Sequence, residues 1–208
     1  MNLSGFKGVI FDLDGTLLDS ERWHKRMEVE TLRGFGLDAT IDDLERYTGM
    51  TYAAMLLDLE SRMGITLDFG RFMEAHKPAL SECVRTNMRL FPDAQPCLTR
   101  IGLPVAVATN SMWWYLDTVI KKFPFVAERI GAYVCGCEVA NGKPHPDAFL
   151  TAARRLGLDA RECVAIEDSR SGVASALAAG CHVVGVERDP KADLSSAHTI
   201  VSGLDDLV

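Results

Sequence analysis

Two aspartates two positions apart follow a short apolar run near the start of the chain. Residues 9–16 read Val-Ile-Phe-Asp-Leu-Asp-Gly-Thr, so Asp12 and Asp14 come directly after three residues typical of a buried strand. Alternation along an extended backbone points both aspartates to one side and Leu13 to the other. Two carboxylates this close repel each other unless a cation lies between them. The pair indicates either a chemically active acidic site or a polar loop that ends the strand.

A hydroxyl-rich segment follows a second apolar run. Thr109, Asn110 and Ser111 come after residues 104–108 and stand before a stretch with helical spacing. Hydroxyl and free backbone N–H groups at the start of a helix can bind a phosphate oxygen. The same residue types are ordinary N-caps, so both interpretations stay open at this point.

One lysine stands beside prolines. Residues 142–147 read Gly-Lys-Pro-His-Pro-Asp. A proline fixes its own φ and holds the residue before it extended, which suits a lysine that must project from a fixed point. The alternative is a surface lysine, Lys143, in a proline-rich turn, and we expect His145 to be an exposed turn residue.

A second acidic pair, Glu167 and Asp168, ends another apolar run and precedes Ser169. If both runs are strands of one parallel sheet, the two acidic pairs can lie at the same edge. Hard oxygen ligands of this kind suit Mg²⁺. An N-cap role for Asp168 or Ser169 is the alternative.

The elements that must position these groups alternate along most of the chain. Apolar runs at 9–11, 104–109, 132–135, 163–166 and 182–186, with a last one within 199–208, are separated by helical spacing at 112–122, 146–156 and 171–179. This order predicts an α/β fold, a Rossmann-like doubly wound parallel sheet with helices on both faces.

Residues 20 to about 86 break that alternation, because helical spacing dominates there. Apolar stripes run from Tyr52 to Met63 and from Phe69 to Val84. We therefore expect a catalytic core of residues 1–18 and 87–208 and an inserted helical domain of residues 19–86.

Composition narrows the class of protein. The chain has 208 residues and a net charge of −7, which argues against nucleic acid or an acidic membrane as the main partner. No apolar run approaches the roughly 20 residues of a membrane span, and no signal peptide is visible, so a cytoplasmic location is expected. The six scattered cysteines are expected to be buried free thiols. The oligomeric state stays open.

Taken together, the segments FDLDGTLLDS, ATNS, GKPHPD and VAIEDSRSG resemble the four motifs of the haloacid dehalogenase-like phosphotransferase superfamily. The resemblance covers residues 9 to about 180, and the block at 20–86 is similar to the C1 cap of that superfamily. The chain looks most like the β-phosphoglucomutase-like sugar phosphatases. This resemblance implies an enzyme that acts on a small phosphorylated metabolite.

The resemblance also implies a role for each motif residue. Asp12 would be the nucleophile that forms an aspartyl-phosphate, and Asp14 would protonate the leaving oxygen and then act as a base. The implied Mg²⁺ ligands are Asp12, the backbone carbonyl of Asp14, and Asp168, with Glu167 contributing directly or through water. Thr109 and the amide of Asn110 would bind phosphoryl oxygens, and Lys143 would offset the charge on Asp12 and the transferring group.

Asp14 and three residues of the insert indicate which branch of the superfamily the chain resembles. The halide-removing and phosphonate-cleaving members lack the second aspartate, so Asp14 favours phosphate ester chemistry. His24 is similar to a hinge histidine that couples cap closure to the acid–base residue, although a packing role is the alternative. Tyr52 stands where the mutases carry a phosphate-binding arginine, while Lys77 is either a second cap phosphate ligand or a solvated residue.

We therefore expect a Mg²⁺-dependent phosphatase of a sugar or sugar-acid phosphate. A β-phosphoglucomutase-like mutase is the alternative within the same chemistry. A catalytically silent binding or regulatory protein on the same fold is the alternative from another class.

Overall fold

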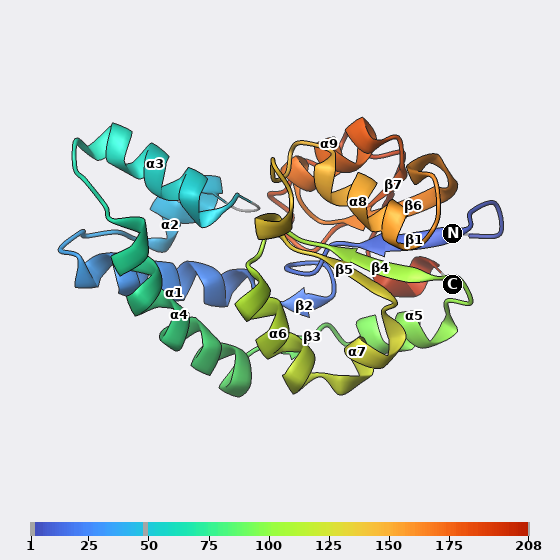
Figure 1. The fold of residues 1–208 in the computed structure, drawn as a ribbon, viewed down its shortest axis with the longest axis horizontal. Coiled ribbons are helices and arrows are strands. Elements are labelled where there is room, and N and C mark those ends of the chain that lie inside the picture. The colour runs from blue at the N-terminus through green and yellow to red at the C-terminus, as the bar shows by residue number, and fades with distance from the viewer. Residues whose placement is uncertain (1–2, 48–49, 208) are drawn as a thin grey trace.

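The computed structural model describes residues 3–47 and 50–207. Its centre is a six-stranded, all-parallel sheet with strand order β5-β4-β1-β6-β7-β8 (Figure 1). The strands are β1 (Gly8–Phe11), β4 (Val105–Ala108), β5 (Ala132–Val134), β6 (Cys163–Glu167), β7 (His182–Val186) and β8 (Thr199–Val201). The predicted α/β fold with a doubly wound parallel sheet is confirmed.

The central strand β1 is buried on both faces, which explains its unbroken apolar sequence. Val9 and Phe11 pack into the core on one face of the sheet. Ile10 packs into the core on the other face. In register, Ile10 lies beside Ala106 of β4 and Ala165 of β6. This small-residue face brings its covering helices close to the sheet.

Helices cover both faces of the sheet, as Figure 1 shows. The helices α8 (Asp147–Arg155) and α9 (Arg170–Ala179) pack their alanines against the face that carries Ile10. The opposite face is covered by α5 (Ala94–Arg100), α6 (Trp113–Lys122) and α7 (Pro124–Arg129). Short 3₁₀ turns occur at Gly136–Glu138, Ala160–Glu162 and Leu204–Leu207.

Between β2 and β3 the described residues form four helices, which make a separate helical lobe on the left in Figure 1. They are α1 (Glu21–Gly34), α2 (Ile41–Leu44), which runs into a 3₁₀ turn (Glu45–Tyr47), α3 (Tyr52–Met63) and α4 (Phe69–Thr86). The lobe has its own buried cluster, which includes Leu32, Leu44, Leu56 and Phe72. The two connections to the sheet pair with each other, because β2 (Leu18–Asp19) and β3 (Arg89–Leu90) are antiparallel.

Several local expectations differ from the structure. The short helices α2, α5 and α7 and the β2–β3 pair were not predicted. Met63 and Phe69 are exposed although they continue apolar stripes, and they are the last residue of α3 and the first residue of α4. All six cysteines are free, but Cys137 is exposed rather than buried. Across the described residues, no helix combines the length and apolar character that crossing a bilayer requires.

Candidate active site

The four sequence segments meet at the carboxyl edge of the sheet. Asp12 follows β1, Thr109 follows β4, and Glu167 is the last residue of β6. These three strands are neighbours and run parallel, so their ends share one edge. Asp12, Asp14, Thr109 and Lys143 line one cavity of about 70 Å³ there.

Lys143 lies at the centre of the site and is buried. Its Nζ donates to Asp12 Oδ1 at 2.5 Å and to Glu167 Oε1 at 2.6 Å. The Asn110 side chain fixes the backbone of the lysine, because Asn110 Oδ1 accepts from Lys143 N at 2.9 Å. Burial alone would lower the pKa of Lys143, but the charges of Asp12 and Glu167 outweigh it and raise the pKa. The lysine is therefore a permanent cation between two carboxylates.

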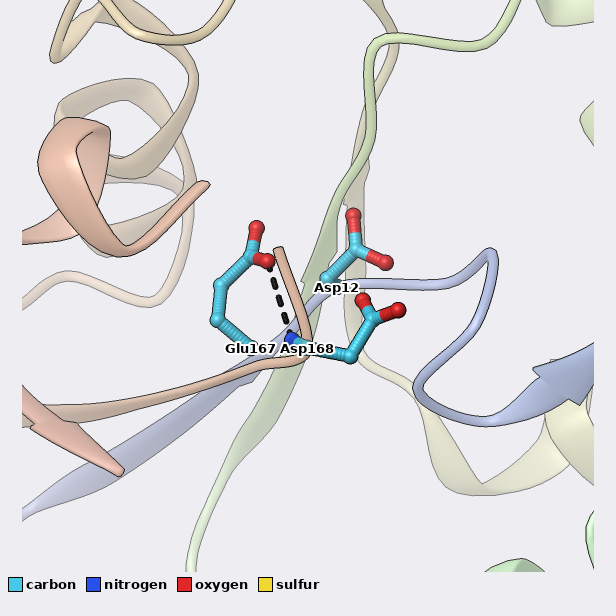
Figure 2. Close-up of side chains that lie close together, drawn as sticks. All are labelled: Asp12, Glu167 and Asp168. Atoms are coloured by element: carbon cyan, nitrogen blue, oxygen red, sulfur yellow. Dashed lines mark hydrogen bonds between the residues drawn. The ribbon is translucent and has the colours of Figure 1, made fainter. Parts of the chain in front are cut away.

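Asp12, Glu167 and Asp168 bring carboxylate oxygens within 4.8 Å of one another (Figure 2). Burial, followed by the charge of neighbouring carboxylates, raises the pKa of Asp168 well above its ordinary value. Burial likewise raises the pKa of Asp12, although Lys143 opposes the shift. Asp12 Oδ2 is buried without a hydrogen-bond partner among the described residues. A divalent cation fits this cluster, because its charge would offset the repulsion among the three carboxylates.

Glu167 is the most heavily bonded of the three acids. In addition to its bond with Lys143, its Oε2 accepts from Asp168 N at 3.1 Å, and from the N and Oγ of Ser169 at 3.2 and 3.0 Å. Asp168 is held instead by Thr16, whose Oγ1 donates to Asp168 Oδ1 at 3.0 Å. The space is tight, since a Cβ on Gly172 would lie 1.8 Å from Glu167 Oε1.

Asp14 accepts hydrogen bonds from several segments of the chain. Its Oδ1 accepts from Ser20 Oγ at 2.8 Å and Tyr115 OH at 2.5 Å, and lies 3.2 Å from His24 Nε2. Its Oδ2 accepts from Ser111 Oγ at 2.7 Å. Burial raises the pKa of Asp14, but the charge and hydrogen bond of His24 and the bonds from Tyr115 and Ser111 outweigh it and lower the pKa to about 2. Asp14 is an anion in this arrangement.

The segment of residues 109–111 lies beside Asp14, at the end of β4. Thr109, Asn110 and Ser111 all line the cavity. Ser111 N donates to Thr109 Oγ1 at 3.0 Å, and Thr109 Oγ1 donates a long bond to Asp14 Oδ2 at 3.5 Å. The segment precedes α6, so its groups stand where a helix N-terminus favours an anion.

The three insert residues named from sequence have different environments. His24 and Tyr52 line the cavity, and His24 Nδ1 lies 3.1 Å from Tyr52 OH. Burial lowers the pKa of His24, but the charge and hydrogen bond of Asp14 outweigh it and raise the pKa to about 9. Lys77 is exposed on α4, with Nζ 5.7 Å from the Trp114 ring centroid, and does not line the cavity. His145 is exposed, as expected.

Four polar residues that the sequence did not assign to the site bond Asp14 or extend the hydrogen bonds that reach it. Ser20 and Tyr115 bond Asp14 directly. His76 Nε2 is hydrogen-bonded to Tyr52 OH, and His76 Nδ1 is hydrogen-bonded to Thr31 Oγ1 in the interior of the helical lobe. His76 lies within the apolar stripe of residues 69–84, and it is buried as that spacing predicts. A polar residue inside an apolar stripe is the signal that could have found it.

Comparison with known proteins identifies the class that this fold and site define. Residues 9–186 match the model of the haloacid dehalogenase-like hydrolase family, and the chain belongs to that family. The resemblance stated from the sequence is thereby confirmed.

Individual relatives agree with membership of the haloacid dehalogenase-like hydrolase family. The chain is 32% identical over 186 residues to hexitol phosphatase A of Escherichia coli (strain K12), covering 86% of this chain and 82% of that protein. It is 32% identical over 188 residues to the chloroplastic protein Suppressor of Quenching 1 of Arabidopsis thaliana, and that match spans 86% of this chain but only 18% of that protein. The crystal structure of a hydrolase from Pseudomonas syringae superimposes with a TM-score of 0.83 at 25% identity, covering 95% of this chain and 94% of that one.

Proposed function

We propose that the protein is a Mg²⁺-dependent phosphatase that hydrolyses the phosphomonoester of a small metabolite, a sugar or a sugar-acid phosphate. The observation that carries this proposal is the state of Asp12. Lys143 holds its Oδ1, and Oδ2 is without a partner among the described residues, in the same cavity as Asp14 and Thr109. A fixed carboxylate with one available oxygen beside a second carboxylate is what nucleophilic attack on a phosphate ester requires.

The proposed reaction has two steps. In the first, an oxygen of Asp12 bonds to phosphorus, the ester P–O bond breaks, and Asp14 gives a proton to the leaving oxygen. In the second, Asp14 takes a proton from a water whose oxygen attacks the aspartyl-phosphate, which releases inorganic phosphate and restores Asp12. Thr109 and the Asn110 amide would bind the phosphoryl oxygens, and Lys143 would offset their charge. General acid catalysis requires the proton of the Asp14–His24 pair to be on Asp14 when the ester oxygen leaves.

Mg²⁺ would be held by Asp12, Asp168 and the backbone carbonyl of Asp14. We assign Glu167 mainly to orienting Lys143, because its oxygens already accept from Lys143, Asp168 and Ser169. When bound, the ion would supply positive charge that lets an anionic nucleophile approach an anionic phosphate.

The helical insert, which we assign as a cap of residues 19–86, supports hydrolysis over mutase chemistry. A mutase must bind a second phosphate in its cap. Tyr52 offers no cation there, and its hydroxyl lies between His24 and His76. Lys77 is outside the cavity, and Lys25 on α1 is the cap lysine that lines it, so Tyr52 is the residue that favours hydrolysis.

The decisive experiment is a screen of polyol, sugar and sugar-acid phosphates, together with p-nitrophenyl phosphate, with Mg²⁺ and with EDTA. We expect phosphate release that EDTA and Asp12→Asn abolish. No turnover with any divalent metal would refute the proposal and favour the silent binding protein. Bisphosphate-dependent isomerisation of a sugar 1-phosphate that exceeds its hydrolysis would establish the mutase instead.

A further inference from the structure

A chain of hydrogen-bonded polar side chains extends from Asp14 into the interior of the helical cap. From Asp14 it passes through His24 on α1, Tyr52 on α3 and His76 on α4, and ends at Thr31 on α1. The successive heavy-atom distances are 3.2, 3.1, 3.0 and 3.0 Å. His76 is fully buried and Thr31 is 8% exposed, so bulk water does not compete for these bonds.

The direction of every hydrogen in the chain follows from its inner end. Thr31 Oγ1 donates its only hydrogen to the carbonyl of Met27 at 2.7 Å, so it accepts from His76 Nδ1. His76 has no acidic neighbour within hydrogen-bond distance in the described structure and is neutral, which leaves a lone pair on its Nε2. Burial and the charge of His24 agree with this, since they lower the pKa of His76 to about 3.

The outer half of the chain follows in turn. Tyr52 OH gives its only hydrogen to His76 Nε2, so the phenol oxygen accepts from His24 Nδ1. His24 therefore carries a hydrogen on Nδ1, and its Nε2 is the nitrogen directed at Asp14. The partner of one ring nitrogen thus determines which nitrogen faces the carboxylate.

We propose that Tyr52, His76 and Thr31 are positioning residues that hold His24, and through it Asp14, in the geometry for proton transfer to the leaving oxygen. The inference rests on the proposed function for its catalytic consequence. Tyr52 stands where a mutase would bind phosphate, but both hydrogen-bonding roles of its hydroxyl are already used within the cap. The cap residue therefore serves the acid–base group rather than a second phosphate.

Leaving-group dependence distinguishes positioning of Asp14 from a general structural role. An alkyl oxygen needs its proton as the P–O bond breaks, whereas p-nitrophenolate leaves with little help. We expect Tyr52→Phe and Thr31→Val to lower kcat/KM for the best alkyl phosphate of the screen roughly 10- to 100-fold. For p-nitrophenyl phosphate kcat/KM should change by less than about threefold, because that ester hardly depends on general acid catalysis.

Matched variants separate this effect from the loss of any hydroxyl. Thr31→Ser retains the donor to Met27 and should restore the alkyl phosphate rate. Tyr133→Phe removes a hydroxyl that donates to the Val126 carbonyl, and Thr118→Val removes one that donates to the Trp114 carbonyl. Both controls should leave the ratio of the two rates unchanged. An equal fall on both esters in Tyr52→Phe, or the same change of ratio in Tyr133→Phe, would overturn the proposal.

A measurement independent of turnover tests the hydrogen-bond directions themselves. ¹⁵N NMR of histidine-labelled protein should show His76 neutral with its hydrogen on Nδ1, and His24 with a protonated Nδ1. Thr31→Val should shift the His76 nitrogens. A His76 protonated on Nε2 alone, or a His24 without a hydrogen on Nδ1, would refute the chain. If wild type hydrolyses neither ester, the proposed function fails, and the NMR spectrum still decides the arrangement.

Discussion

Removing the central lysine tests the electrostatic account of the site most directly. The Lys143 side chain is 2% exposed, and those of its partners Asp12 and Glu167 are 10% and 0% exposed. Lys143→Met preserves much of the volume and removes the charge, which leaves two buried carboxylates without their shared cation. Breaking a buried pair in this way typically costs about 3–5 kcal/mol of stability. Protonation of one carboxyl will reduce that cost.

The effect on turnover has two parts that act in the same direction. Losing one charge stabiliser lowers the rate about 10²–10³-fold. In addition, Asp12 loses the cation that opposes the increase of its pKa by burial, and a protonated Asp12 is a poor nucleophile. We therefore expect kcat/KM for p-nitrophenyl phosphate to fall at least 10²-fold with saturating Mg²⁺.

Steady-state kinetics and urea unfolding together check this prediction. Lys122→Met is the matched control, because among the described residues Lys122 Nζ donates to the carbonyls of Val84 and Met88, and Lys122 does not line the cavity. The control should retain turnover. A Lys143→Met protein that folds and turns over within threefold of wild type would remove this lysine from the mechanism. Unchanged urea stability would contradict the burial argument.

Three further predictions concern stability and local packing. The folded protein holds His76 in its neutral form, because its pKa is lowered from an ordinary 6.5 to about 3. Between these two pH values the histidine is protonated in the unfolded chain but not in the folded one. Wild-type stability should therefore fall by roughly 1.4 kcal/mol per pH unit from this group down to about pH 3. The unfolding free energy of His76→Gln, measured in urea, should fall less steeply with decreasing pH than that of wild type. Equal pH dependence in the two proteins would contradict a neutral His76 in the fold. Gly172→Ala places a Cβ 1.8 Å from Glu167 Oε1 and should lower p-nitrophenyl phosphate turnover at least ~10-fold, since Glu167 must shift. Asp93→Ala leaves Arg188 without its bonds of 3.0 and 2.8 Å and should lower the unfolding free energy by about 3 kcal/mol in urea, with turnover retained.

The spacing of apolar residues, together with the residues that begin and end helices and strands, made most of the elements of the core predictable. The strand that ends at Phe11 and the helix that begins after Ser169 were both predicted within a residue or two, because a continuous apolar run and an N-cap serine are local features. The pairing of Leu18 with Leu90 was not predicted. It joins two-residue strands from opposite ends of the insert, and strands this short have no pattern of their own.

The residues that surround Asp14 show the limit of local reasoning. Ser111 and Tyr115 lie 97 and 101 positions away along the chain, and their hydroxyls reach Asp14 because β4, which leads into α6, pairs with β1. Tyr115 and His76 stand on apolar helix stripes, where periodicity predicts burial but does not say which polar atom another element will offer. Burial of these side chains was predictable, while their partners were not.

The sequence by itself determined which chemical groups stand at the active edge. Asp12, Thr109 and Asp168 directly follow strand ends, and parallel strands bring their carboxyl ends to one edge. Lys143 reaches this edge from the loop between β5 and α8. Only the tertiary structure decided how the second aspartate is held. Its partner His24 comes from a helix outside the sheet, and the orientation of that ring depends on contacts among three cap helices. Hydrogen-bond direction is a property of the assembled contacts, because each hydroxyl has one hydrogen to give and its neighbours determine where it goes.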